Sequence, residues 1–217
     1  MKLKTVLALG GVMVLLEGVA FALPIFINFD TDAYGNPITV PGLFTQTTLL
    51  TELYAPLGVH FAGPSPGQGG AILNAAIGSW NVSALSGPNI LGFNSKDTYA
   101  FQPETITFDT LMTSVSIFAA DADATTAATF TVQAYGAGAV LLDSDSINIP
   151  GPSSGFSRLI VSSSSGIDQV VLSETGGYAF EFDNLSASPV PEPSALALIG
   201  LGASLVCYAG RSRTAKS

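Results

Sequence analysis

The chain has 217 residues, and its 16 acidic residues outnumber its 7 basic residues, which gives a formal net charge of −9. This charge repels nucleic acids and anionic lipids, so nucleic-acid binding is excluded as a function class. A single cysteine excludes a disulfide framework.

Residues 1–22 have the three parts of a secretory signal peptide. Lys2 and Lys4 precede an apolar stretch over 6–16, and Ala20-Phe21-Ala22 supplies the small residues of an A-x-A cleavage site. We predict cleavage after Ala22, with Ala20 and Ala22 as the site residues. An uncleaved anchor is the alternative, which the short apolar stretch disfavours. The start of the chain therefore predicts export by the Sec route.

Residues 23–188 are long enough for one domain with its own core. Two basic residues, Lys96 and Arg158, and 14 acidic residues fall in this segment, so its net charge is −12. Such a surface suits cations or uncharged partners such as glycans. Because the only cysteine is Cys207, the domain has no disulfide and no thiol chemistry, and its core alone must stabilise it.

Apolar and polar residues alternate with a period of two through most of this domain, as in half-buried β-strands. The predicted strands lie at 25–30, 57–62, 105–109, 114–119, 129–134, 140–149, 156–162, 167–173 and 178–183. About nine or ten strands at this spacing predict an all-β fold, an antiparallel β-sandwich. The segment 45–54 has the pattern of a short helix, and 63–70 and 150–155 are predicted loops.

Two candidates for nucleophilic catalysis fail on their chemistry. Gly63-Pro-Ser65-Pro-Gly67 has the letters of the G-x-S-x-G motif, but Pro66 has no N–H to donate to an oxyanion, and no helix follows directly. His60, the only histidine, would need a nucleophile and an orienting acid. Its alternation places it on the outer face of a strand, so we interpret it as a surface or edge histidine. We predict no catalytic residues.

Three pairs of aspartates are two residues apart, so each pair shares one face of a strand. The pairs are Asp30 with Asp32, Asp121 with Asp123, and Asp143 with Asp145. Paired carboxylates suit Ca²⁺, which binds hard oxygen ligands. Solvated acids that keep sheet edges apart are one alternative. A glycosidase is another, although no aromatic cluster flanks any pair.

The segment 189–217 combines a spacer, an apolar run and a basic end. Pro189, Pro191 and Pro193 keep the spacer extended. We predict a transmembrane helix over 194–210, although its uncharged run spans only about 24 Å of a ~30 Å hydrocarbon core. A buried core helix is the alternative. The basic residues Arg211, Arg213 and Lys216 decide for the membrane, because such a cluster belongs on the cytoplasmic side of a span.

This tail resembles the PEP-CTERM sorting signal of Gram-negative bacteria. The matching parts are Val190-Pro191-Glu192-Pro193-Ser194, the apolar run, and Arg211-Ser-Arg213. The resemblance implies that an integral-membrane exosortase recognises Pro191, Glu192 and Pro193 and cleaves nearby. These three would then be recognition residues, and the mature protein would have no membrane helix, as after processing of a GPI signal.

The domain resembles the jelly-roll, lectin-like modules that PEP-CTERM proteins often carry. The resembling residues are Ile27-Asn28-Phe29-Asp30, the run from Leu53 to Phe61, the strand from Phe118 to Asp121, and Phe182-Asp183-Asn184-Leu185-Ser186. The first and last strands of a jelly roll commonly lie side by side, which would bring Asp30, Asp32, Asp183 and Asn184 together. The resemblance implies a structural Ca²⁺ at these four residues, with solvated edge acids as the alternative.

These features predict a non-enzymatic exported protein. Its precursor is anchored in the inner membrane and is then sorted to the cell surface or to the extracellular polysaccharide matrix. The Sec machinery and the exosortase are the expected transient partners. A carbohydrate-binding, lectin-like module is the alternative, for which Trp80, Tyr99 and Tyr135 are candidate platform residues unless they belong to the core. A glycoside or ester hydrolase is a minor alternative.

Overall fold

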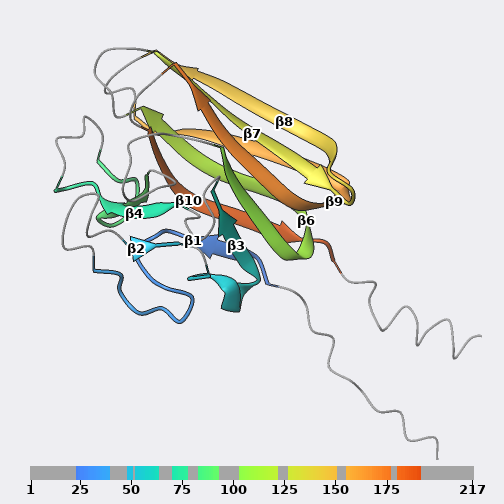
Figure 1. Ribbon diagram of the computed structural model, residues 1–217, viewed down its shortest axis with the longest axis horizontal. Helices are drawn as coiled ribbons and strands as arrows, with labels where there is room; N and C mark the ends of the chain where they lie inside the picture. The colour runs from blue at the N-terminus through green and yellow to red at the C-terminus, as the bar shows by residue number, and fades with distance from the viewer. Residues whose placement is uncertain are drawn as a thin grey trace, which may run out of the picture. The chain divides into compact units, whose positions relative to one another are not determined.

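The computed structural model describes residues 23–39, 48–50, 52–63, 70–77, 83–92, 103–121, 127–150, 155–176 and 180–191. Over these ranges the chain is all-β, with one short 3-10 helix, η1 (Ala55–Leu57). The strands, shown in Figure 1, are β1 (Ile25–Ile27), β2 (Thr48–Leu49), β3 (Val59–Ala62), β4 (Ala71–Asn74), β5 (Asn89–Leu91), β6 (Glu104–Asp121), β7 (Ala128–Gly136), β8 (Val140–Ile149), β9 (Ser157–Thr175) and β10 (Phe180–Pro189).

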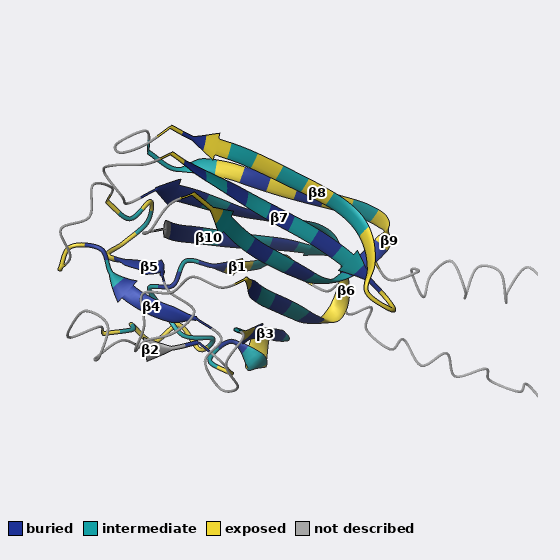
Figure 2. Ribbon diagram, turned by 45° about the horizontal axis from the view of Figure 1, so that its top comes forward, coloured by how far each residue is buried: buried dark blue, intermediate teal, exposed yellow. Residues whose placement is uncertain are grey.

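The strands form one continuous antiparallel sheet that folds over on itself. Their order is β2-β4-β5-β10-β6-β9-β7-β8, with β1 paired to β10 and β3 paired to β6. The rings of Phe130 on β7 and Phe182 on β10 have centroids 5.7 Å apart, although three strand spacings along a flat sheet would separate them by about 14 Å. Two layers therefore face each other across the buried core in Figure 2, and the predicted antiparallel sandwich is confirmed.

The two longest strands, β6 and β9, belong to both layers. The first half of β6 pairs with β3 and the second half of β9, while the second half of β6 pairs with β10 and the first half of β9. The β6–β9 register shifts between Thr107 and Met112. Opposite this bend, Gly166 has a φ of +86°, and a Cβ there would lie 2.8 Å from Leu111 Cδ1. Glycine therefore permits the bend.

Three sequence expectations about elements are wrong. The predicted helix at 45–54 contains the strand β2, which pairs with β4. The strands predicted at 105–109 and 114–119 are one strand, β6, that continues through its bend. The strands predicted at 156–162 and 167–173 are likewise one strand, β9. The sequence pattern also missed β4 and β5, because their buried residues follow one another without alternation.

The first and last strands of the domain lie side by side, as expected. Ile25 pairs with Ala187 and Ile27 with Leu185. Strand β10 continues to Pro189, and the Val190 N–H donates to the Leu111 carbonyl at 2.8 Å. Residues 22–190 form a compact unit. No helix in the described ranges is long and apolar enough to span a membrane, and the predicted helix over 194–210 lies outside them.

Candidate functional site

The pairing of β1 with β10 brings two of the predicted metal-binding carboxylates to one loop. Asp183 Oδ2 accepts hydrogen bonds from the backbone N–H groups of Leu85 at 2.9 Å and Ser86 at 3.0 Å. Asp30 Oδ1 accepts the N–H of Asn89 at 3.1 Å. Both carboxylates thus hold the loop before β5, Asp30 from the segment after β1 and Asp183 from the first half of β10.

Asn184 joins this cluster, while Asp32 has a separate role. Asn184 Oδ1 accepts the Ser86 hydroxyl at 2.8 Å. Asp32 Oδ1 instead accepts the N–H groups of Tyr34 and Asn36, both at 2.9 Å, within its own turn. The structure therefore gathers Asp30, Asp183 and Asn184 around one loop, and Asp32 stabilises the neighbouring turn.

The environment of the cluster disfavours negative charge. Burial raises the pKa of Asp183 to about 6, because backbone donors only partly offset desolvation and the Asp30 charge. Burial also raises the pKa of Asp30 above its ordinary value. A cation would relieve this cost. In the part of the chain that the structure describes, no group of three or more His, Cys, Asp or Glu residues is arranged to hold a metal ion, so calcium stays a prediction.

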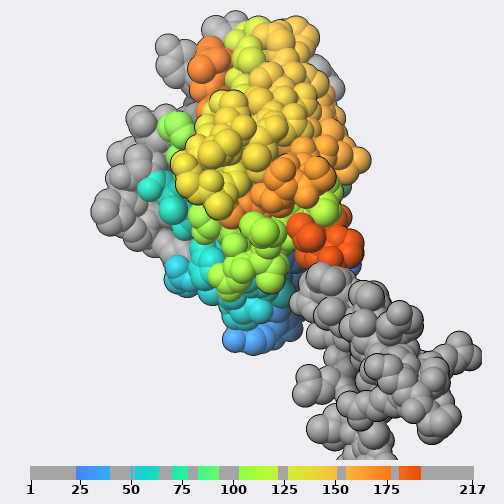
Figure 3. Space-filling model, turned by 90° about the vertical axis from the view of Figure 1, so that its right-hand side faces the viewer, coloured from blue at the N-terminus to red at the C-terminus, as the bar shows by residue number. Residues whose placement is uncertain are grey.

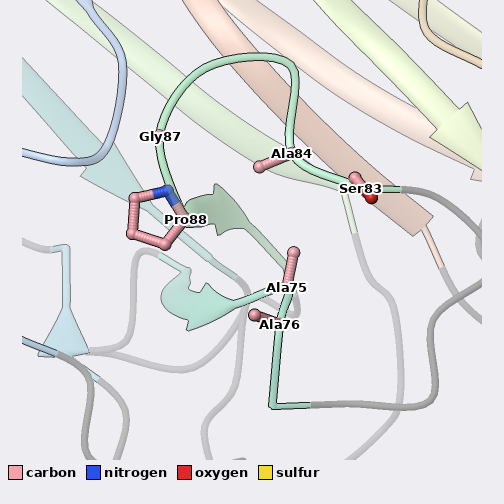
Figure 4. A pocket seen from close by; sticks show the side chains of 6 residues that line it. All are labelled: Ala75, Ala76, Ser83, Ala84, Gly87 and Pro88. Carbon is pink, nitrogen blue, oxygen red and sulfur yellow. The ribbon is translucent and has the colours of Figure 1, made fainter.

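A small pocket lies beside this loop, as Figure 4 shows. It has a volume of about 100 Å³ and is lined by Ala75, Ala76, Ser83, Ala84, Gly87 and Pro88. Gly87 has a φ of +52°, and a Cβ there would lie 2.3 Å from Asp30 Cγ, so the loop needs glycine to approach this carboxylate. Its lining offers one hydroxyl, that of Ser83, and small apolar surfaces.

His60 on β3 lies between two exposed carboxylates. Its Nδ1 is 2.7 Å from Glu52 Oε2, and its Nε2 is 3.1 Å from Asp109 Oδ1. The hydrogen bond to Glu52 is the main cause that raises the pKa of His60, and the bond to Asp109 adds to it. The predicted outer-face position is confirmed, and the ring joins the turn before η1 to the bend of β6.

Asp143 and Asp145 on β8 clamp the free edge of β9. Asp145 Oδ2 accepts the Ile160 N–H at 2.9 Å, and Asp143 Oδ2 accepts the Ser162 N–H at 2.8 Å. Donors and acceptors are both two residues apart, so the pleats of the two strands match. These carboxylates close the gap between the edges of the two layers.

Two glutamates that the sequence analysis did not single out are fully buried. Glu104 on β6 and Glu181 on β10 are at most 2% exposed, and their carboxyl oxygens have no hydrogen-bond partner among the described residues. Burial raises the pKa of each to about 8, and Asp183 contributes to that of Glu181. The signal for Glu104 was its position in phase with Ile106 and Phe108, which both face the core.

The outward side of one layer carries neutral polar side chains, and we call it the neutral face. Directly paired residues share a face. Beyond His60 and Ala62 of β3, the register assigns 13 described residues of four adjacent strands to this face, all of them neutral and all but Val171 polar. They are Thr105, Thr107, Thr129, Thr131, Gln133, Tyr135, Ser144, Ser146, Asn148, Gln169, Val171, Ser173 and Thr175. Hydrogen bonds join Thr131 to Ser146 at 2.8 Å and Asn148 to Thr129 at 3.1 Å. This ladder gives the acidic domain one uncharged, hydrogen-bonding surface.

Several sequence candidates lie outside the described residues. They are Ala20, Ala22, Ser65, Trp80, Tyr99, Glu192, Pro193, Arg211, Arg213 and Lys216. Of the sorting-signal residues, Pro191 is described and is exposed. Of the platform candidates, Tyr135 is described, and its hydroxyl donates to Gln133 Oε1 at 3.2 Å.

The end of β10 leads directly into a segment with known relatives. Residues 189–213 match the family model of the PEP-CTERM protein-sorting motif. This chain carries a PEP-CTERM sorting signal. The matched segment begins at Pro189, which is the last residue of β10, so the signal follows the domain in the chain without a linker.

Comparisons of the whole chain are less specific. No match was found among curated proteins. Among solved structures, the K2 cleaved adhesin domain of Lys-gingipain has a TM-score of 0.46 at 13% identity, covering 76% of this chain and 99% of that one. A DUF4465 family protein from Bacteroides caccae has a TM-score of 0.43 at 13% identity, covering 61% and 80%. The carbohydrate-binding module TmCBM61, in complex with β-1,4-galactotriose, has a TM-score of 0.37 at 9% identity, covering 61% and 88%. The PEP-CTERM signal is thus the finding that directs the functional interpretation.

Proposed function

We propose that this chain is a non-enzymatic exported protein that an exosortase processes and that is then displayed at the cell surface or in the extracellular polysaccharide matrix. The sorting signal at 189–213 carries this proposal. A strongly acidic domain without disulfides fits such a role, because it stays soluble and stable through its own core. The Sec machinery, the membrane and the exosortase are then transient partners of the precursor.

Replacement of the motif tests this function. The full chain and the variant Pro191→Ala/Glu192→Ala/Pro193→Ala are expressed in a host with an exosortase and in the same host without it. The wild type is expected to lose its tail and reach the extracellular fraction. The variant should keep its Lys216-Ser217 end and remain with the membrane. The control Ser188→Ala leaves the motif intact, and processing of the triple variant at the wild-type rate would refute the proposal.

A second candidate function is binding of uncharged polysaccharide at the neutral face. Its hydroxyl and amide groups can replace the hydrogen bonds that sugar hydroxyls make with water. Tyr135 adds an aromatic ring at one end of this surface, next to Gln133 and opposite Gln169 on β9. An uncharged surface on a domain of charge −12 favours neutral glycans over anionic ones, which the rest of the domain repels.

A glycan array separates this candidate from simple display. We expect neutral polysaccharides to bind and anionic ones not to bind. Tyr135→Ala should weaken binding at least tenfold, while Tyr34→Ala, at a 78% exposed tyrosine outside the neutral face, should not. If no glycan binds, the lectin-like function is wrong and the export function stands.

Calcium binding at the Asp30, Asp183 and Asn184 cluster is a separate proposal. Thermal unfolding of the domain is measured with Ca²⁺ on the order of 1 mM and, separately, with EDTA. At a Ca²⁺ concentration about 100 times the Kd, one site would add about 2.7 kcal/mol to the free energy of unfolding. A bound ion should raise the Tm, and Asp183→Asn should abolish the increase while Asp32→Asn leaves most of it. Equal Tm values with Ca²⁺ and EDTA would exclude the site.

A further inference from the structure

The folded domain extends to the edge of the recognition motif. Pro189 is the last residue of β10 and pairs with Met112. Beyond it, the Val190 N–H donates to the Leu111 carbonyl at 2.8 Å, and the Thr113 hydroxyl donates to the Ser188 carbonyl at 3.0 Å. Pro191, which follows directly, begins the Pro-Glu-Pro motif. No free linker separates β10 from the motif.

The residues just before the motif are held in the core of the sheet. Strand β10 lies between β1 and β6, so both of its edges are paired near its end. Leu185 and Ala187 are at most 2% exposed. A protease that cut before Val190 would have to separate the end of β10 from β6 and break all three hydrogen-bonded or paired contacts. Among the described residues, the last backbone hydrogen bond of this strand is the one that the Val190 N–H donates.

The apolar run sets the other limit. Four residues, 191–194, lie between Val190 and the start of this run at Ala195, and fully extended they span at most about 14 Å. The headgroup region on one side of a bilayer is roughly 6 Å thick and takes up part of this distance. In the membrane-bound precursor, the processing enzyme therefore works in a short gap. Figure 3 shows the end of β10 at the surface of the domain, next to β6.

We propose that the chain is processed while its domain is folded, at a peptide bond between Val190 and Ala195, so that β10 stays whole in the mature protein. This inference rests on the proposed exosortase function. The C–N bond at the cut breaks, water supplies the hydroxyl of the new carboxyl group, and the released tail takes the proton at its new amino group. The fold itself then sets the upstream limit of the cut.

The C-terminal residue of the processed protein tests this limit. Full-length protein is expressed in its exosortase-containing host, and the mature form is analysed by intact mass and by sequencing of its C-terminal peptide. We expect an end between Val190 and Ser194. An end at Pro189 or earlier, or beyond Ala195, would overturn the inference while leaving exosortase processing intact. An uncut Lys216-Ser217 end in the wild type would instead overturn the proposed function and this inference with it.

A covalent lock tests whether β10 opens before the cut. Ser114 and Ser188 pair directly across β6 and β10, at a spacing that a disulfide can bridge. The variant S114C/S188C in a C207S background is compared with S114C/C207S, and the bridge is verified by mass. We expect processing rates within about twofold of each other. A rate at least tenfold lower in the locked variant, restored by reductant, would show that β10 must open and would overturn the inference.

Discussion

His60 links two turns through both of its ring nitrogens. Each nitrogen faces a carboxylate, Glu52 or Asp109, so the protonated ring, which donates twice, fits this place best. The raised pKa of His60 has the same cause. Its contribution to stability is fully present below the unfolded pKa of about 6.5 and disappears as pH rises through the folded pKa.

We therefore predict that His60→Ala destabilises the domain by about 0.5 kcal/mol at pH 5.5, as for other exposed ion pairs, and by almost nothing at pH 9. Urea unfolding at both pH values measures the difference. His60→Gln, which can donate from one side only, serves as the control. A cost that is equal at the two pH values would mean that packing, rather than charge, explains the role of this residue.

The pKa of Glu104 is raised as well, but burial rather than a charged partner raises it. Its carboxyl group is buried near Gly70 and has no partner in the part of the chain that the structure describes, so ionisation is costly and its pKa rises to about 8. The folded state holds the proton more tightly than the unfolded state. Stability is therefore lost as pH increases from about 4.5 to 8.

Glu104→Gln keeps the shape of the side chain and cannot ionise. We expect little change in the free energy of unfolding at pH 5 and a gain of about 1–4 kcal/mol at pH 9. Thr107→Ser, on the outward side of the same strand, is the control that changes no titrating group. Parallel pH profiles for the wild type and Glu104→Gln would contradict the buried, protonated state of this residue.

At the scale of the elements, the clamp between β8 and β9 protects a strand edge. Without Asp143 and Asp145, two backbone N–H groups of β9 would lack acceptors, and an exposed edge invites pairing with other chains. Asp143→Ala/Asp145→Ala should lower the free energy of unfolding by about 1–3 kcal/mol and promote aggregation. Urea unfolding and light scattering measure these effects. Ser144→Ala, between the two, should change neither, and a double variant as stable and monomeric as the wild type would exclude the clamp.

The elements that could be predicted were those with an independent local pattern. Strand β8 at Val140–Ile149 has the bounds that its alternation predicts. The bend of β6 could not be predicted, because the exposed residues Asp109 to Leu111 look like a loop when their partners on β9 are unknown. The role of Asp143 and Asp145 was hidden for a related reason. Two acids on one face fit a metal site locally, and only the packing of the two layers shows which donors they meet.

At the scale of the whole molecule, the sequence predicted the sorting signal better than the chemistry of the domain surface. The sorting signal is read from contiguous residues, so Pro191, Glu192 and Pro193 were found without any fold. The neutral face joins residues from β6 to β9 that are up to 70 positions apart, from Thr105 to Thr175. Its uniform chemistry emerges only from the register of the strands. The convergence of Asp30 with Asp183 was predictable because it needed one topological rule, that the first and last strands are neighbours.

The pairing of β1 with β10 also determines how the domain resists mechanical force. The start of β1 lies beside the end of β10, so pulling Leu23 away from Val190 peels the two strands apart one rung at a time. Gly155 lies just before the start of β9, at the opposite end of the sheet from Val190. Pulling Val190 away from Gly155 loads β10 in shear, so the hydrogen bonds of β10 to β6 and β1 resist together. Single-molecule stretching should give a higher rupture force in the second geometry, and equal forces would contradict it. A protein that is held at its C-terminal end and pulled at the opposite end of the sheet would therefore resist a larger force than one whose β1 and β10 are pulled apart from their shared end.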